Sequence, residues 1–103
     1  MTPPDRRRRV AVVGGGISGL AAAHRLRELA EDGSLPLEAV VLEGSARLGG
    51  VISTVSRDGF LLEEGPDSIV TDKPWALRLV ERIGLMERLV GTSGENRRSF
   101  VVR

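Results

Sequence analysis

Glycines close to the amino terminus are arranged so that the main chain could approach a phosphate group. The pattern G-x-G-x-x-G runs through Gly14, Gly15, Gly16, Ile17, Ser18 and Gly19. Gly14 would allow a tight turn, Gly16 would leave room for a pyrophosphate, and Gly19 would let a helix lie close to a strand. The pattern stands between an apolar run and a helical segment, which is the context that indicates a dinucleotide fingerprint. We therefore expect the positive end of that helix to face phosphates, the alternative being a glycine-rich turn without a ligand.

A carboxylate follows at the end of the next apolar run. Glu43 comes after Val40, Val41 and Leu42, and it lies 24 residues beyond Gly19. An acid at that place can accept hydrogen bonds from both ribose hydroxyls of a dinucleotide, and it is expected about 20 residues after the glycines. An acid rather than a base argues against the 2′-phosphate of NADP. The alternative for Glu43 is an ordinary exposed glutamate.

The loop after Glu43 distinguishes an FAD-binding sequence from an NAD-binding one. Its distinctive residues are Gly44, Arg47, Gly49 and Gly50. This loop resembles the extended FAD fingerprint of the glutathione reductase and amine oxidase superfamilies, in which an acid is followed by an arginine and a Gly-Gly pair. The resemblance implies that the glycines pass close to the diphosphate and that Arg47 adds positive charge there or braces the loop. The alternative for Arg47 is a surface arginine.

A second loop narrows the resemblance. It contains Gly65, Pro66, Asp67 and Ser68. The glycine pattern, the Glu-x-x-x-Arg-x-Gly-Gly segment and this Gly-Pro-Asp-Ser loop, in that order, resemble the bacterial protoporphyrinogen and coproporphyrinogen III oxidases of haem synthesis. The insert at residues 35–38, Leu-Pro-Leu-Glu, is similar to the coproporphyrinogen-oxidising branch. The resemblance extends over residues 10–103.

The resemblance implies a cofactor, a reaction and a site. FAD would lie with its pyrophosphate at Gly14–Gly19, its adenosine ribose at Glu43 beside Gly44, and its isoalloxazine ring near Gly65–Ser68. Coproporphyrinogen III or protoporphyrinogen IX would be oxidised to the porphyrin, with molecular oxygen reduced to hydrogen peroxide. Relatives often carry a basic residue after the Gly-Gly pair, whereas this chain has Val51. No catalytic side chain is assigned in this segment, because in such an enzyme the flavin carries the redox chemistry.

The elements that must position these residues follow from hydrophobic periodicity. Strands are expected at residues 10–13, 40–42, 51–55, 60–62 and 99–102. A first helix is expected at residues 17–31, ended by Asp32 and Gly33. A second is expected to be capped by Thr71 or Asp72 and stopped by Gly84, with one more helical turn at residues 85–89.

Together these elements predict an α/β fold. The fold would be a Rossmann-like βαβ FAD-binding segment of a larger flavoprotein of the glutathione reductase or amine oxidase type, and it would be incomplete. Residues 1–9 are expected to form a disordered basic terminus, and residues 10–103 a partial FAD-binding domain that lacks the substrate domain and the carboxyl-terminal FAD-binding part. Because the cofactor site would be half-built and a strand at residues 99–102 would expose an unpaired edge, we expect the chain alone to bind FAD weakly or not at all.

Composition excludes several other functions. The chain has a net charge of +1, one histidine and no cysteine, so disulfides, thiolate sites and multi-histidine metal sites are excluded. Three aromatic residues are too few for stacking on nucleic acid, and no apolar run reaches the roughly 18 residues of a membrane span. Arg6–Arg9 is interpreted as a solvated flank rather than an export signal or a nucleic-acid patch. His24 is interpreted as a solvated helix residue rather than a general base.

We therefore expect a cytoplasmic enzyme, with any peripheral membrane association made by regions outside this chain. Two alternatives stay open. Other FAD-dependent enzymes, an amine oxidase or a carotenoid desaturase, suit residues 1–50 almost equally well. A non-catalytic nucleotide-binding module belongs to another class, and it predicts that residues 1–103 form a stable fold by themselves.

Overall fold

The computed structural model describes residues 7–95, 98 and 100–102. They form two compact units, one within residues 1–68 and one within residues 69–103. Each unit is described by itself. Most of the predicted disordered start, residues 1–6, lies outside the described residues.

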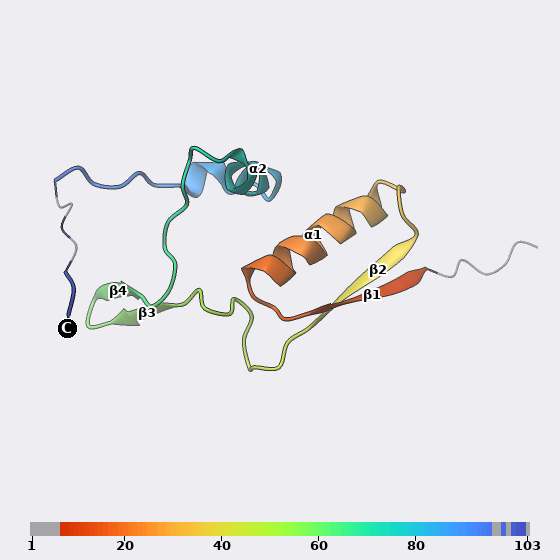
Figure 1. Ribbon diagram of the computed structural model, residues 1–103, viewed down its shortest axis with the longest axis horizontal. Helices are drawn as coiled ribbons and strands as arrows, with labels where there is room; N and C mark the ends of the chain where they lie inside the picture. The colour runs from red at the N-terminus through yellow and green to blue at the C-terminus, as the bar shows by residue number, and fades with distance from the viewer. Residues whose placement is uncertain (1–6, 96–97, 99, 103) are drawn as a thin grey trace, which may run out of the picture. The chain divides into compact units, whose positions relative to one another are not determined.

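The first unit begins with a βαβ arrangement. Strand β1 (Arg8–Val13) pairs in parallel with strand β2 (Leu37–Leu42), and helix α1 (Ile17–Glu31) connects them. Figure 1 shows α1 lying along one face of the two strands. The register sets Val13 opposite Leu42, so the glycine turn after β1 and Glu43 after β2 leave the sheet at the same edge. The α/β prediction is confirmed, with both strands two or three residues longer than expected.

The sequence around α1 explains its bounds. Gly16 is the N-cap, with extended backbone and no hydrogen bond from a capping side chain. The helix ends at Asp32, whose carboxylate accepts a hydrogen bond from the N–H of Ser34, and Gly33 takes a positive φ of 79°. Such a glycine commonly ends a helix, because it lacks the Cβ that disfavours the left-handed conformation. The predicted helix at residues 17–31 is confirmed.

A β-hairpin completes the ordered part of the first unit. Strand β3 (Thr54–Arg57) pairs antiparallel with β4 (Phe60–Glu63) around a two-residue turn. Asp58 and Gly59 both have positive φ, 51° and 80°, as the tightest hairpin turns require. The prediction of a strand at residues 51–55 is wrong at its start. Instead, the N–H of Ile52 bonds the carbonyl of Gly49 in a turn, so β3 begins only at Thr54.

The second unit contains helix α2 (Pro74–Arg82) and a short 3-10 helix, η1 (Met86–Arg88). The N-cap of α2 is Lys73, so the predicted caps at Thr71 or Asp72 are wrong. Pro74 decides the start, because its fixed φ suits the first helical position and it has no N–H to satisfy. Gly84, with φ 73°, follows the helix end as predicted.

The predicted strand at residues 99–102 is also wrong. Phe100, Val101 and Val102 have no strand structure, and Ser99 lies outside the described residues. Their apolar, β-branched character suits a strand, but a strand exists only when another supplies its hydrogen-bond partners.

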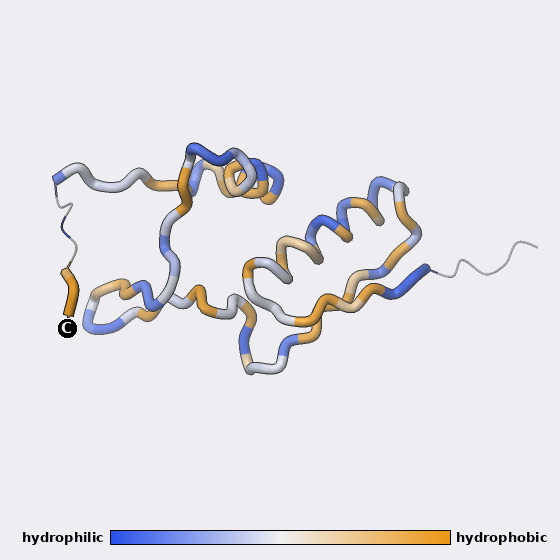
Figure 2. Tube along the Cα trace, viewed as in Figure 1, coloured by the Kyte–Doolittle hydropathy of each residue, from blue (hydrophilic) through white to orange (hydrophobic). Residues whose placement is uncertain are grey.

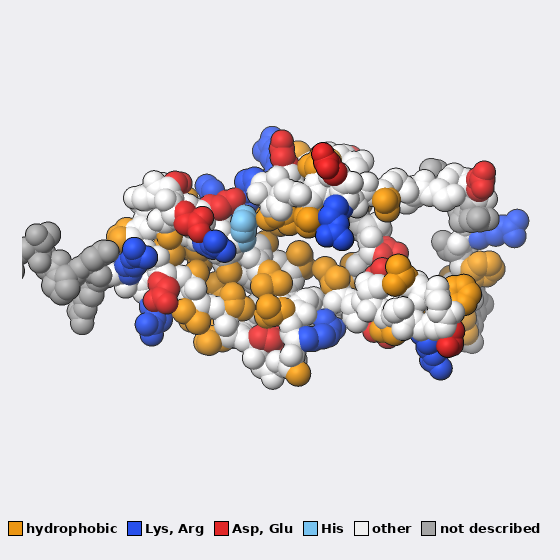
Figure 3. Space-filling view, turned by 180° about the vertical axis from the view of Figure 1, so that it is seen from behind, with side chains coloured by type: hydrophobic (Ala, Val, Ile, Leu, Met, Phe, Trp, Pro, Cys, Tyr) orange, Lys and Arg blue, Asp and Glu red, His pale blue; other side chains and the backbone are white. Residues whose placement is uncertain are grey.

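Little apolar surface is buried within the described residues. Leu37, 7% exposed, is the one buried apolar side chain among them, whereas Val13 is 84% exposed. Figure 2 shows the hydrophobic runs along β1 and β2, and Figure 3 shows apolar side chains open on the visible face. In the part of the chain that the structure describes, no helix combines the length and apolar character needed to cross a bilayer.

Candidate functional site

The glycine turn between β1 and α1 is held by its own main chain. Gly14 has a φ of 98°, and its N–H donates to the carbonyl of Leu42 at 2.7 Å. A Cβ at Gly19 would overlap the carbonyl oxygen of Gly14. Gly14 therefore supplies the turn, and Gly19 allows the first turn of α1 to lie directly on it. Gly15 is buried, and a Cβ there would meet the side chains of Leu48 and Glu43.

Gly16 has more room around it than Gly15 and Gly19, and unlike Gly14 it has an ordinary negative φ. A Cβ built on it would have the Cα of Gly50, 3.9 Å away, as its nearest neighbour. Its φ of −76° suits any residue. Neither packing nor backbone conformation within the described structure therefore requires glycine here. The absence of a side chain instead leaves the space in front of the helix start free.

The carboxylate of Glu43 is tied to two main-chain N–H groups. Its Oε2 accepts from Gly15 at 2.6 Å, and its Oε1 accepts from Ser45 at 2.9 Å. Because these bonds favour the ionised form, the Ser45 N–H first and the Gly15 N–H second hold the pKa of Glu43 below its ordinary value. Each carboxylate oxygen keeps a lone pair for a further donor. Glu43 is thus a fixed anion at the end of β2.

The Gly-Gly pair brings the next loop back to the glycine turn. The N–H of Gly49 donates to the carbonyl of Gly15 at 2.8 Å, and Gly16 and Gly49 form an isolated parallel bridge. Gly49 and Gly50 have φ values of 111° and 60°, which L side chains rarely adopt. A Cβ at Gly50 would also come within 3.1 Å of the Cα of Gly16. Both glycines are therefore required by the geometry of this approach.

Arg47 braces that loop. Its Nη1 donates to the carbonyls of Leu48 at 3.2 Å and Ile52 at 3.1 Å, and its Nη2 donates to that of Gly50 at 2.7 Å. Of the two roles expected for Arg47, the structure shows bracing by hydrogen bonds.

These elements enclose a groove of about 380 Å³ at the start of α1. It is lined by Val13, Gly14, Gly16, Ile17, Ser18, Gly19, Gly49, Gly50 and Val51. The groove lies within the first unit, and all its lining residues are uncharged. The first N–H groups of α1 have no partners inside the helix, and no capping side chain is bonded to them. The groove therefore offers main-chain donors and a positive helix end, the combination that binds phosphate.

Gly65 fixes the start of the second loop against this site. A Cβ at Gly65 would overlap the carbonyl oxygen of Val51, so only glycine allows this approach. The N–H of Glu64 also bonds the carbonyl of Ser53 at 2.8 Å, and the Ser53 hydroxyl donates to the Glu64 carboxylate at 2.9 Å. Pro66, Asp67 and Ser68 are exposed and do not line the groove.

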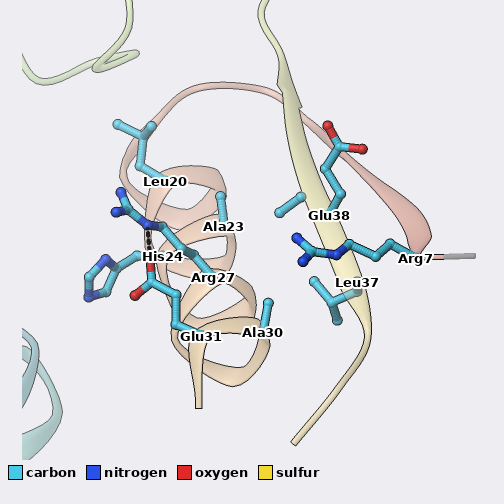
Figure 4. Close-up of a pocket in the computed structure, with 10 residues that line it drawn as sticks. Arg7, Leu20, Ala23, His24, Arg27, Ala30, Glu31, Leu37 and Glu38 are labelled. Atoms are coloured by element: carbon cyan, nitrogen blue, oxygen red, sulfur yellow. Dashed lines mark hydrogen bonds and ion pairs between the residues drawn. The ribbon is translucent and has the colours of Figure 1, made fainter. Parts of the chain in front are cut away.

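A larger hollow, about 470 Å³, lies along α1 and β2 and contains none of the predicted site residues. Figure 4 shows Ala23 and Ala30 on the side of α1 that faces β2, where Leu37 lies. The Arg27 and Glu31 side chains on its rim pair with each other at 2.7 Å. Size alone would favour this hollow, but its charged lining residues Arg27 and Glu31 pair with each other, and it contains no glycine turn or helix start that could hold a phosphate.

His24 lies on the rim of the same hollow, with its Nε2 3.1 Å from the Glu28 carboxylate. It is not among the residues that line the glycine groove. The interpretation of His24 as a solvated helix residue is wrong in its exposure, because the side chain is 33% exposed and its Nε2 is buried beside Glu28.

Two contributions to the site are not evident from the motifs. Val13 lines the groove as the last residue of β1. Its position directly before the glycines is the sequence signal that could have identified it as a lining residue. Ser45 anchors Glu43 through its main-chain N–H. No sequence signal identifies that role, because every residue except proline has such a group.

Comparison with known proteins agrees with a groove suited to a dinucleotide. Residues 17–103 match the family described as flavin containing amine oxidoreductase. The chain belongs to this family. Membership confirms the predicted flavoprotein fold and the predicted cofactor, FAD.

Several relatives of this chain are porphyrinogen oxidases. The chain is 43% identical over 89 residues to the coproporphyrinogen III oxidase of Bacillus subtilis (strain 168), which covers 86% of this chain and 19% of that protein. It is 42% identical over 94 residues to the coproporphyrinogen III oxidase of Propionibacterium freudenreichii, covering 91% and 17%. The predicted resemblance to porphyrinogen oxidases is confirmed. The chain spans about a fifth of the length of these curated relatives.

Solved structures agree with this assignment. A protein from Exiguobacterium sp. 255-15 assigned as a protoporphyrinogen oxidase superposes with a TM-score of 0.67 at 45% identity. That match covers 78% of this chain and 17% of the other. A triple mutant of putrescine oxidase, redesigned in its cofactor binding, superposes with a TM-score of 0.64 at 37% identity, covering 76% and 16%.

Proposed function

We propose that this chain forms the dinucleotide-binding segment of an FAD-dependent porphyrinogen oxidase, acting on coproporphyrinogen III. One observation carries the cofactor site: the uncharged groove at the start of α1, where a Cβ at Gly16 would enter free space. The substrate assignment rests on the relatives. Curated coproporphyrinogen III oxidases match at 34–43% identity and two plant protoporphyrinogen oxidases at 33–34%. A solved structure assigned as a protoporphyrinogen oxidase matches at 45%, so a substrate panel must decide between the two porphyrinogens.

Within this proposal each cluster has a defined task. The glycine turn would hold the FAD diphosphate with its main chain, and the Gly49–Gly50 pair would close the groove from the opposite side. Glu43, held ionised by Gly15 and Ser45, would accept hydrogen bonds from the adenosine ribose with its remaining lone pairs. Gly65 would set the loop of Pro66, Asp67 and Ser68 beside the isoalloxazine ring.

FAD, when bound, supplies the redox chemistry by accepting hydrogen from the porphyrinogen, with molecular oxygen as the final acceptor. This chain's own residues would bind and orient the cofactor. We propose residues 10–103 as a partial FAD-binding domain and a cytoplasmic location for the enzyme.

Gly16→Ala tests the cofactor site. Because the new methyl group meets no protein atom closer than 3.9 Å, the variant should fold, losing at most the roughly 1 kcal/mol by which alanine is a poorer N-cap than glycine. The methyl group would occupy the space assigned to the diphosphate, so FAD affinity should fall by about tenfold or more. Flavin fluorescence quenching gives the affinity. Unchanged FAD affinity would refute this location.

A substrate panel tests the reaction. The FAD-loaded full-length protein should convert coproporphyrinogen III to a fluorescent porphyrin with release of hydrogen peroxide, faster than it converts protoporphyrinogen IX. Putrescine is the third substrate, because the similarity to a putrescine oxidase structure favours an amine oxidase as the second candidate. Peroxide release from putrescine without turnover of either porphyrinogen would support that candidate instead.

A further inference from the structure

The groove assigned to FAD has no charged side chain in its lining, although a diphosphate is an anion. The lining comes from residues 13–19 and 49–51, apart from Gly15, and includes only glycine, serine, valine and isoleucine. Val51 is 74% exposed there and cannot pair with a phosphate. Within the described residues, electrostatic stabilisation of a diphosphate in this groove therefore falls to the main chain and the start of α1.

Arg47 is the basic residue of the fingerprint, but it is not among the lining residues. Its guanidinium donates to the carbonyl before the Gly-Gly pair (Leu48), to one within it (Gly50) and to one after it (Ile52). Its Nη1 is also the nearest atom that a Cβ on Gly49 would meet, at 3.2 Å. The side chain thus lies behind the turn that forms one wall of the groove.

The position of this wall depends on that turn. Gly49 is bonded to the carbonyl of Gly15, and Gly50 comes close to Gly16. Glycine adopts positive φ without strain, but two successive glycines leave a loop with many accessible conformations unless other groups hold it in one. Three hydrogen bonds from a rigid, planar cation supply such a restraint.

We propose that Arg47 is a positioning residue of the FAD site, not a phosphate ligand. It fixes Gly49 and Gly50 against the glycine turn, and residues 7–95 bind the diphosphate through main-chain N–H groups without a cationic side chain. This inference rests on the proposed function, since it assumes that FAD occupies the groove.

Affinity measured against salt concentration separates the two roles of Arg47. A phosphate ligand contributes a Coulombic attraction that salt screens, whereas a bracing residue does not. The FAD dissociation constant is measured from about 50 mM to about 500 mM sodium chloride for the unaltered protein and for Arg47→Met, Arg47→Lys and Val51→Arg. Arg47→Met should weaken binding by about tenfold or more, with its salt dependence unchanged. Arg47→Lys should also weaken binding, because a point charge does not reproduce the planar fork.

Val51→Arg is the positive control, because it places a cation in the lining. It should tighten FAD binding at low salt by roughly tenfold and steepen the salt dependence. The phosphorus NMR resonances of bound FAD should move in Val51→Arg and stay in place in Arg47→Lys.

The opposite results would overturn the inference. Loss of salt dependence in Arg47→Met, together with full affinity in Arg47→Lys, would make Arg47 a phosphate ligand. Failure of the proposed function has a different signature, in which Gly16→Ala and Val51→Arg both leave FAD affinity unchanged. That signature would remove the site and this inference together.

Discussion

The carboxylate of Glu43 accepts a hydrogen bond of 2.6 Å from the N–H of Gly15, 28 residues earlier in the chain. The bond joins the end of β2 to the glycine turn after β1. It places an anion beside the turn without filling the groove, since neither Glu43 nor Gly15 is among the lining residues. The two halves of the proposed dinucleotide site are therefore held together before any ligand is present.

Glu43→Gln should show the contribution of this anion. Glutamine presents one acceptor and one donor, so one of the two N–H groups, Gly15 or Ser45, loses its partner. We expect the variant to be less stable and to bind FAD more weakly. Thermal unfolding of the FAD-free protein and fluorescence titration with FAD measure the two effects. An unchanged melting temperature would show that the Gly15 and Ser45 contacts do not stabilise the fold.

The same pair predicts a pH dependence. The pKa of Glu43 lies below its ordinary value, about 4.5, because Ser45 and Gly15 donate to the ionised form. A depressed pKa gives stability that is present above the unfolded value and lost as pH falls through the folded value. The stability difference between the unaltered protein and Glu43→Gln should therefore be constant from about pH 7 to about 4.5 and shrink below it. A difference that shrinks between pH 7 and 5 would contradict the assigned contacts.

Gly19→Ala should destabilise the fold itself. The added Cβ would overlap the carbonyl oxygen of Gly14, which is main chain and moves only if α1 shifts from the sheet. We expect a loss of about 1–3 kcal/mol in the free energy of unfolding. Gly91→Ala is the matched control, because a Cβ there has no neighbour within 4 Å. The control should change stability by less than about 0.5 kcal/mol, as for a surface substitution.

Gly65→Ala should affect the groove through Val51. Its Cβ would overlap the Val51 carbonyl oxygen, so Val51 or the loop after Gly65 must move. Because Val51 lines the groove, we expect lower FAD affinity and an altered flavin absorption spectrum. Gly94→Ala, a loop glycine in open space, serves as the control. Equal spectra and affinities for both variants would separate Gly65 from the cofactor site.

His24→Gln should leave the reaction unchanged. His24 lies beside Glu28 on α1, outside the lining of the glycine groove. Such a helix pair contributes little, so stability should change by less than about 0.5 kcal/mol. The pH–rate profile of porphyrinogen oxidation is the decisive measurement. A profile that loses an ionisation in the variant would return His24 to consideration as a base.

Local signals were sufficient for part of this structure. Gly16 and the Asp32–Gly33 pair fix the bounds of α1, and the Asp58–Gly59 turn fixes the hairpin, because each acts on its immediate neighbours. At α2, local reasoning chose the wrong signal. Thr71 and Asp72 have favourable side chains for capping, but Pro74 determines where the helix begins.

Contacts between segments far apart in the chain could not be predicted from the sequence. Nothing in the residue types shows that Gly49 bonds the Gly15 carbonyl or that Arg47 selects three carbonyls of its own loop. The residues at 100–102 show that strand propensity alone does not predict a strand. Their strand propensity is real, but propensity does not supply the hydrogen-bond partner that a strand requires.

The bridge between Gly16 and Gly49 also constrains the order of events during folding. One wall of the groove comes from residues 13–19 and the other from residues 49–51. A chain emerging from the ribosome exposes the helix start long before it has made the opposite wall. If the groove holds FAD as proposed, flavin loading would wait until the loop braced by Arg47 has been synthesised and has closed back on the first turn.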